Sequence, residues 1–125
     1  MAAVELAVCL PLVAVVVFAS IEACSMVFLK IALQTSAYEA ARVAIAPNGT
    51  VTDAAERANQ VLSQRTVHDG EIQVSPTNLR DLAVGQQVVV TATAPIASNR
   101  VIAGWFFGAG NLSASTVMLK EGNSY

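Results

Sequence analysis

Two carboxylates stand in a segment that is otherwise made of apolar side chains. Glu5 precedes a run, residues 6–21, that holds no charged residue, and Glu22 ends that run. An ionised carboxylate in apolar surroundings is costly unless a cation or a set of hydrogen-bond donors satisfies it. A charge inside an apolar segment therefore indicates a functional site, and both acids predict a partner.

The two cysteines lie in the same N-terminal segment. Cys9 and Cys24 are fifteen residues apart, which on a helix separates them by roughly 22 Å, far beyond the reach of a disulfide. We expect both to behave as small buried hydrophobic residues, with a bridge between two chains as the alternative.

The remaining reactive side chains do not predict an enzyme. His68 is the only histidine and stands beside Asp69 in a turn sequence. The sequence holds no cluster of metal ligands, no glycine-rich phosphate loop and no nucleophile with a base, so we expect no catalysis, no metal and no cofactor. Asn48 and Asn111 match the short glycosylation acceptor pattern, which occurs mostly by chance.

Composition points to a membrane rather than to nucleic acid. The chain is 54% hydrophobic and 13% charged, with a net charge of -2, whereas a soluble domain has about 25% charged residues. Residues 6–21 alone are slightly short of the roughly 20 residues that cross a bilayer. If Glu22 lies at the interface or against a partner, the apolar segment extends to Lys30 and can span a membrane.

The start of the chain lacks the basic residues of a secretory signal. The first basic residue is Lys30, after the apolar run, while the remainder is rich in Thr, Ser and Asn and resembles an extracytoplasmic domain. A basic leader that has been removed resolves this conflict with the positive-inside rule. We therefore expect Met1 to be a processed N-terminus with a free α-amine.

The sequence predicts one long helix over residues 2–46. It contains no glycine, and its only proline, Pro11, predicts a kink or local melting. Its second half combines a polar stripe of Thr35, Glu39 and Arg42 with a small-residue surface of Leu33, Ala37, Ala40, Ala41 and Ala44. Such a surface suits close helix packing, and the spacing of Glu39 and Arg42 predicts a solvated ion pair.

The rest of the chain predicts a small α+β head over residues 47–125, separate from a transmembrane or filament-core helix over residues 1–46. The head begins at a proline–glycine stop, followed by a helix over residues 52–65. Alternation then predicts strands at residues 71–75 and 88–93, and β-prone residues predict a third at 112–119; the three form an antiparallel sheet. The very apolar residues 101–107 are expected to fold under the sheet as core, with an exposed aromatic patch that meets a neighbouring subunit as the alternative.

Several sequence elements resemble a known family, the TadE-like pseudopilins of tight-adherence pilus systems, within the type IV pilin group. The elements are residues 2–7, 10–12, 21–22, 30–34 and 37–44, with a looser likeness over residues 89–95 and 112–116. The resemblance implies a type IV pilin-like fold and a prepilin peptidase that removes the leader. One departure is Leu6, where many relatives have an aromatic residue.

The resemblance also implies a mechanism of assembly. Glu5 would pair with the free amine of Met1 of a neighbouring subunit, so that the charges are neutralised only in register. Glu22 would pair with Lys30 or Arg42 of an adjacent subunit, or would only mark the end of the span. The residues expected at subunit contacts are Met1, Glu5, Pro11, Glu22, Lys30, Glu39 and Arg42.

The predicted function is that of a structural pilin subunit of an extracellular filament, used for surface attachment. Its partners would be copies of itself, other pilins, an inner-membrane assembly platform, the prepilin peptidase and, before assembly, membrane lipid. The subunit would move from the inner membrane to the cell surface. The alternatives are a single membrane-anchored binding domain and a minor pseudopilin that primes assembly.

Overall fold

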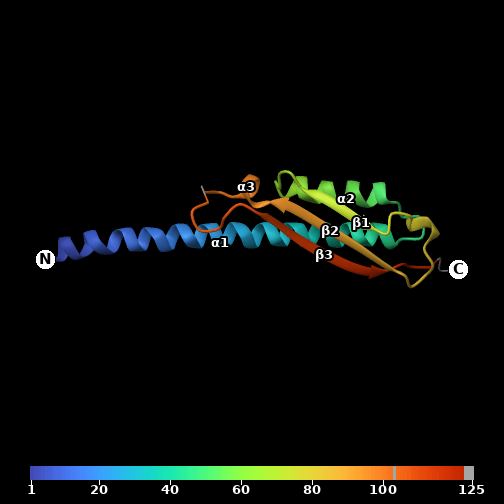
Figure 1. The fold of residues 1–125 in the computed structure, drawn as a ribbon, viewed down its shortest axis with the longest axis horizontal. Helices are drawn as coiled ribbons and strands as arrows, with labels where there is room; N and C mark the ends of the chain where they lie inside the picture. Colours follow the sequence, from blue (N-terminus) through green and yellow to red (C-terminus); the bar gives the residue numbers. More distant parts are fainter. Residues whose placement is uncertain (103, 123–125) are drawn as a thin grey trace.

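The computed structural model describes residues 1–102 and 104–122 as a long helix carrying a small head (Figure 1). The elements, in chain order, are α1 (Ala2–Ile45), α2 (Val51–Gln64), β1 (Glu71–Ser75), η1 (Leu79–Asp81), β2 (Gln87–Pro95), α3 (Ile96–Asn99) and β3 (Asn111–Leu119). This layout confirms the predicted α+β fold with a long N-terminal helix, a second helix and a three-stranded antiparallel sheet.

Helix α1 is 44 residues long and runs without interruption through Pro11. The predicted local melting at this proline is therefore wrong. A proline removes a single N–H donor from the helix, here the one that would reach the Ala7 carbonyl, and the hydrogen bonds on either side remain. The helix consequently extends as one coil from the N-terminus into the head (Figure 1).

The two halves of α1 have different surroundings. Residues 2–17 extend beyond the head, and all of their side chains are exposed or half-buried (Figure 1). From Glu22 onward one face of the helix is buried; its residues are Glu22, Leu29, Ala32, Leu33, Ser36, Ala37, Ala40, Ala41, Ala44 and Ile45. The predicted small-residue surface is thus confirmed, and it packs within the same chain.

Helix α2 lies against this small-residue surface. Its N-terminus is capped by Thr50, whose hydroxyl accepts a hydrogen bond from the Asp53 backbone N–H at 3.1 Å. Between the helices, a Cβ atom at Gly49 would lie 2.8 Å from the Ala44 carbonyl oxygen. The chain therefore reverses direction in a space that only glycine fits.

The sheet has the order β1-β2-β3, with both pairs antiparallel. Along the central strand β2, alternate residues are buried: Val88, Val90, Ala92 and Ala94. They form one core with the buried face of α1 and with Ala54, Ala58 and Leu62 of α2. The C-terminal half of α1 therefore packs against both α2 and the sheet, and α2 also contacts β1.

A buried lysine ties the end of β3 to the end of α1. The Lys120 Nζ donates hydrogen bonds to the carbonyl oxygens of Ala44, at 3.1 Å, and Ala46, at 2.6 Å. The Glu121 backbone N–H donates to the Ile45 carbonyl at 3.1 Å. Together these donors satisfy carbonyls that the last turn of a helix leaves without intrahelical partners.

The apolar segment around residues 101–107 is not part of the core. Trp105 is 77% exposed, and Val101, Phe106 and Phe107 are also exposed; Ala103 lies outside the described residues. The prediction that this segment folds under the sheet is therefore wrong. The inward face of the sheet already packs on the alanines of α1, and that close spacing leaves no room for aromatic rings. The alternative, an exposed aromatic patch, agrees with the observed exposure.

Candidate assembly and membrane surface

Glu5 and Met1 lie at the free tip of α1, far from the head (Figure 1). Both are exposed, and the Met1 carbonyl accepts hydrogen bonds from the backbone N–H groups of Val4 and Glu5 at 3.1 and 3.2 Å. Among residues 1–102 and 104–122 the only ion pair lies elsewhere, between Glu39 and Arg57. The Glu5 carboxylate thus has no cationic partner in the described part of its own chain.

The surface around Glu5 is apolar on every side of the helix. The exposed large side chains of this part of α1 are Val4, Leu6, Val8, Leu10, Leu12, Val13, Val15, Val16 and Val17. Pro11 lies among them, also exposed. Helix α1 is long and apolar enough to cross a membrane, and none of its most apolar 18-residue window is buried within the chain. A helix that is apolar all round belongs in lipid or among other helices.

Glu22 has a partner that sequence reasoning missed. Its side chain is 2% exposed, and its carboxylate accepts hydrogen bonds from the backbone N–H groups of Phe106, at 3.1 Å, and Phe107, at 3.5 Å. Neither Lys30 nor Arg42 of the same chain reaches it. The glycines at positions 104, 108 and 110 were the only sequence signal, because glycine-rich backbone exposes N–H groups that can bind a carboxylate.

Lys30 connects α1 to β3 rather than to an acid. Its Nζ donates a hydrogen bond to the Ser113 carbonyl oxygen. One turn later, the Gln34 side-chain amide donates to the Thr116 hydroxyl at 3.1 Å. Lys30 therefore helps to orient the sheet along the helix, and its pairing with an acid of a neighbouring subunit stays a prediction.

Glu39 forms its ion pair with Arg57 of α2 and not with Arg42. The Glu39 carboxylate accepts hydrogen bonds from Arg57 Nε at 3.3 Å and from its terminal nitrogen at 3.1 Å. The predicted pair within α1 is wrong because α2 brings a guanidinium to Glu39 across the helix–helix contact. Arg42 is exposed and, with Asn48 and Asp53, lines an open hollow between the helices.

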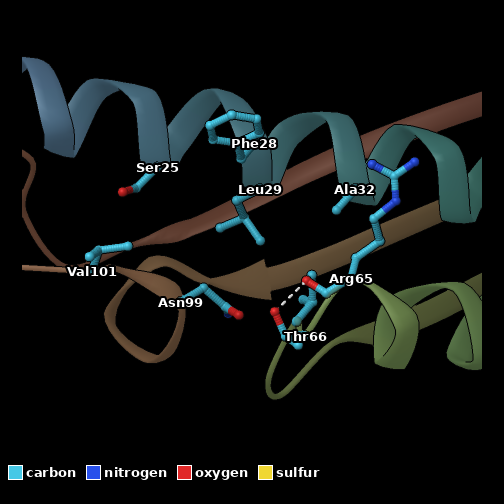
Figure 2. Close-up of a pocket in the computed structure, with 9 residues that line it drawn as sticks. Ser25, Phe28, Leu29, Ala32, Arg65, Thr66, Asn99 and Val101 are labelled. Atoms are coloured by element: carbon cyan, nitrogen blue, oxygen red, sulfur yellow. Dashed lines mark hydrogen bonds between the residues drawn. The ribbon is translucent and has the colours of Figure 1, made fainter.

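A pocket of about 300 Å³ lies where α1, the end of α2 and the α3 region meet (Figure 2). Ser25, Phe28 and Leu29 of α1 line one side of it, and Arg65 and Val101 lie at opposite ends in this view. These side chains combine no nucleophile with a base.

The polar side chains nearest this pocket form hydrogen bonds with backbone groups. The Asn99 amide donates to the carbonyl oxygens of His68 and Pro95, at 2.8 Å each, and its oxygen accepts from the His68 backbone N–H at 2.7 Å. The Ser25 hydroxyl donates to the Ile21 carbonyl oxygen at 3.0 Å. The arrangement braces the loop that carries α3 and offers no group poised for chemistry.

The remaining reactive side chains are the possible metal ligands, the cysteines and the two candidate glycosylation sites. The described part of the chain contains no group of three or more His, Cys, Asp or Glu residues able to hold a metal ion. Cys9 and Cys24 are free and exposed in the single chain, so their burial in lipid or among the helices of other subunits stays a prediction. Asn48 and Asn111 are also exposed.

Comparison with known proteins adds one finding, which concerns the first third of the chain. No curated protein and no solved structure gives a significant match. The model of the TadE-like protein family matches residues 1–42. This match covers the bare apolar half of α1 and most of the half that packs into the head. Residues 1–42 are therefore similar to TadE-like proteins, in agreement with the resemblance seen in the residues around Glu5 and Glu39.

Proposed function

We propose that this chain is a structural pilin subunit of a tight-adherence filament that assembles through α1. The observation that carries the proposal is the bare first half of α1, which exposes apolar side chains on all sides and a single carboxylate, Glu5, near its tip. The match of residues 1–42 to the TadE-like family supports a role in such a pilus system.

Burial of the exposed side chains drives both insertion into the membrane and assembly into the filament. Each valine or leucine removed from water contributes about 1.5–3 kcal/mol, and residues 4–17 expose nine of them. Before assembly, lipid of the inner membrane surrounds these side chains. In the filament, the same side chains pack against α1 helices of neighbouring subunits, so the subunit exchanges one apolar environment for another.

Glu5 sets the axial register between neighbouring subunits during assembly. Its carboxylate enters an apolar filament core only when a cation accompanies it, and the cation in this proposal is the α-amine of Met1 from the adjacent subunit. An out-of-register neighbour would leave both charges buried and unpaired. The pair therefore selects one axial offset between subunits.

The proposed role is structural rather than catalytic. The chain would be processed by a prepilin peptidase, extracted by an inner-membrane assembly platform and polymerised with itself or with other pilins. The head, which α2 and the sheet form around the second half of α1, would then lie on the outer surface of a filament that attaches the cell to surfaces.

Replacing Glu5 tests this proposal. Glu5→Ala should abolish or sharply reduce filaments sheared from cells while the chain still inserts into the membrane, because the substitution removes a charge and no apolar contact. Glu5→Asp is the matched control, since it keeps a carboxylate and should retain some assembly. Filament yield is measured in the sheared fraction and insertion in the membrane fraction. Normal filament yield from Glu5→Ala would refute the role of Glu5.

A further inference from the structure

We propose that the exposed side chains of Val101, Trp105, Phe106 and Phe107, here called the aromatic loop, anchor the stored subunit in the outer interface of the bilayer. Glu22 is the positioning residue that holds this loop against α1. The inference rests on the proposed function in one respect, since it requires α1 to span the membrane. It adds a second lipid contact, made by the head, that sets how deeply the subunit lies.

The position of the aromatic loop along α1 is the first argument. Phe106 lies with Phe18 and Glu22 around a small pocket of about 130 Å³, and it also lies near Met26. From Leu6 to Ile21 there are 16 uncharged residues, which at 1.5 Å each span about 24 Å, slightly less than the roughly 30 Å of the hydrocarbon core. The loop thus meets α1 at the level where a spanning helix leaves the hydrocarbon.

The composition and exposure of the loop are the second argument. Trp105 is 77% exposed and Phe106 and Phe107 are 44% and 42% exposed. Their exposed surface continues onto Phe18 of α1, which lines a small pocket with Trp105 and Phe106 and is exposed as well. Indole and phenyl rings concentrate at the level of the lipid headgroups in membrane proteins. The structure therefore joins an interfacial type of side chain to the end of a candidate span.

The hydrogen bonds of Glu22 are the third argument. A loop that enters a bilayer must satisfy its backbone N–H groups internally, because lipid offers no acceptors in the hydrocarbon region. The buried Glu22 carboxylate accepts from the N–H groups of Phe106 and Phe107. It thereby satisfies two donors at the apolar apex of the loop and leaves the aromatic rings to face outward.

A cation lies beside the loop. Arg100 is exposed, and its guanidinium folds across Gly104, where a side chain would collide with it and with the Phe107 carbonyl. A guanidinium next to interfacial aromatic rings is placed to bind the phosphate of a lipid headgroup. The same arrangement would gain nothing from the apolar surface of a second α1.

Trp105 is the only tryptophan of the chain, so its fluorescence reports on the loop without any substitution. The full chain is reconstituted into phosphatidylethanolamine–phosphatidylglycerol vesicles that contain phosphatidylcholine brominated either near the headgroup or near the end of the acyl chain. We expect blue-shifted emission that the shallow bromines quench more strongly than the deep ones. Acrylamide in the aqueous phase should quench it weakly.

Cys9 separates failure of this inference from failure of the proposed function. In a Cys24→Ser variant, Cys9 is the only thiol, and it should resist a membrane-impermeant maleimide when α1 spans the bilayer. If Cys9 is protected but Trp105 emits as in water and is insensitive to bromolipids, the aromatic loop is no anchor although the span stands. If Cys9 is labelled, α1 does not span, and both proposals fail.

Contact with a second copy of the chain is also distinguishable. In that case the emission of Trp105 would be blue-shifted only at high protein-to-lipid ratio and would not respond to the depth of the bromines. That result would overturn the anchor.

A matched pair of variants tests the positioning role of Glu22. Glu22→Ala removes both acceptors, so quenching by shallow bromolipids should weaken and quenching by acrylamide should strengthen as the loop N–H groups turn toward water. Glu22→Gln keeps one acceptor oxygen and should lie between Glu22→Ala and the unmodified chain. Equal depth profiles in all three proteins, with Cys9 protected in each, would refute the positioning role.

Discussion

The two halves of α1 share a high apolar content and differ in what surrounds them. Residues 2–17 contact almost nothing of their own chain, whereas from Leu29 to Ile45 one face is buried against α2 and the sheet. In the first half, valine and leucine occur on every side of the helix. In the second half, small alanines are concentrated on one face, and Gln34, Tyr38 and Arg42 are exposed on the other.

This difference shows that the arrangement of apolar side chains, and not their number, determines which half of α1 the head covers. Alanines on one face let a second helix and a sheet approach closely, so the second half completes the core of a small head. Bulky side chains on all faces cannot be covered by one small head. The first half therefore stays exposed in the single chain, as the proposed contacts with lipid and with other copies of the chain require.

A charge introduced into the middle of the first half should have the largest effect. Val13→Arg places a guanidinium near the centre of the proposed span, where arginine costs about 2.5–3.5 kcal/mol of insertion. The amount of chain recovered in the membrane fraction should fall sharply, while the thermal unfolding of the head stays unchanged.

The matched change in the second half is Tyr38→Arg, at a side chain that is 47% exposed. It should leave insertion unaffected, because residue 38 belongs to the head. Equal losses of insertion from Val13→Arg and Tyr38→Arg would contradict the division of α1 into two functional halves.

Enlarging an alanine should have a large effect in the second half of α1 and little effect in the first half. Ala40 is fully buried, so Ala40→Leu overpacks the contact between α1 and the head and should lower the free energy of unfolding by roughly 1–3 kcal/mol. Ala7→Leu, in the exposed half, should leave the head as stable as before. Thermal unfolding in detergent, followed by circular dichroism, measures both; a stable Ala40→Leu head would show that the packing is loose.

The smallest effect is expected at the ion pair between the helices. Glu39 and Arg57 side chains are 27% and 40% exposed, so solvent screens the pair, and Glu39→Gln should cost only about 0.2–1 kcal/mol of head stability. The loss should shrink further in high salt. If Glu39→Gln instead abolishes filaments without changing unfolding, the predicted role of Glu39 between subunits gains support.

Most of the fold followed from local patterns. Absence of glycine over residues 2–46 predicted α1. Alternation predicted the first two strands and β-propensity the third, all within two residues of their ends. The prediction of local melting at Pro11 was wrong, because one missing hydrogen-bond donor does not interrupt a long helix. The prediction that residues 101–107 belong to the core was wrong, because apolar character does not reveal whether the core still has space.

The candidate site was predictable where a residue acts alone and not where it depends on tertiary contacts. Glu5 stood out as a charge beside an apolar run, and the structure leaves it exposed at the tip of α1. Glu22 stood out in the same way, but its partners are backbone N–H groups 84 and 85 residues away. Likewise Arg57 reaches Glu39 only after α2 folds back. Contacts between residues so far apart in the chain produce no recognisable spacing pattern in the sequence.

Whether the first half of α1 forms the filament core can be tested on filaments sheared from cells that express the Cys24→Ser variant. The filaments are treated with an impermeant maleimide, and the intact mass of the chain in them is then measured. We expect an abundant chain that begins at Met1 and carries no adduct, because Cys9 would be buried among neighbouring α1 helices. Absence of the chain from the sheared fraction, or an adduct on Cys9 within it, would contradict the claim that the first half of α1 forms the filament core.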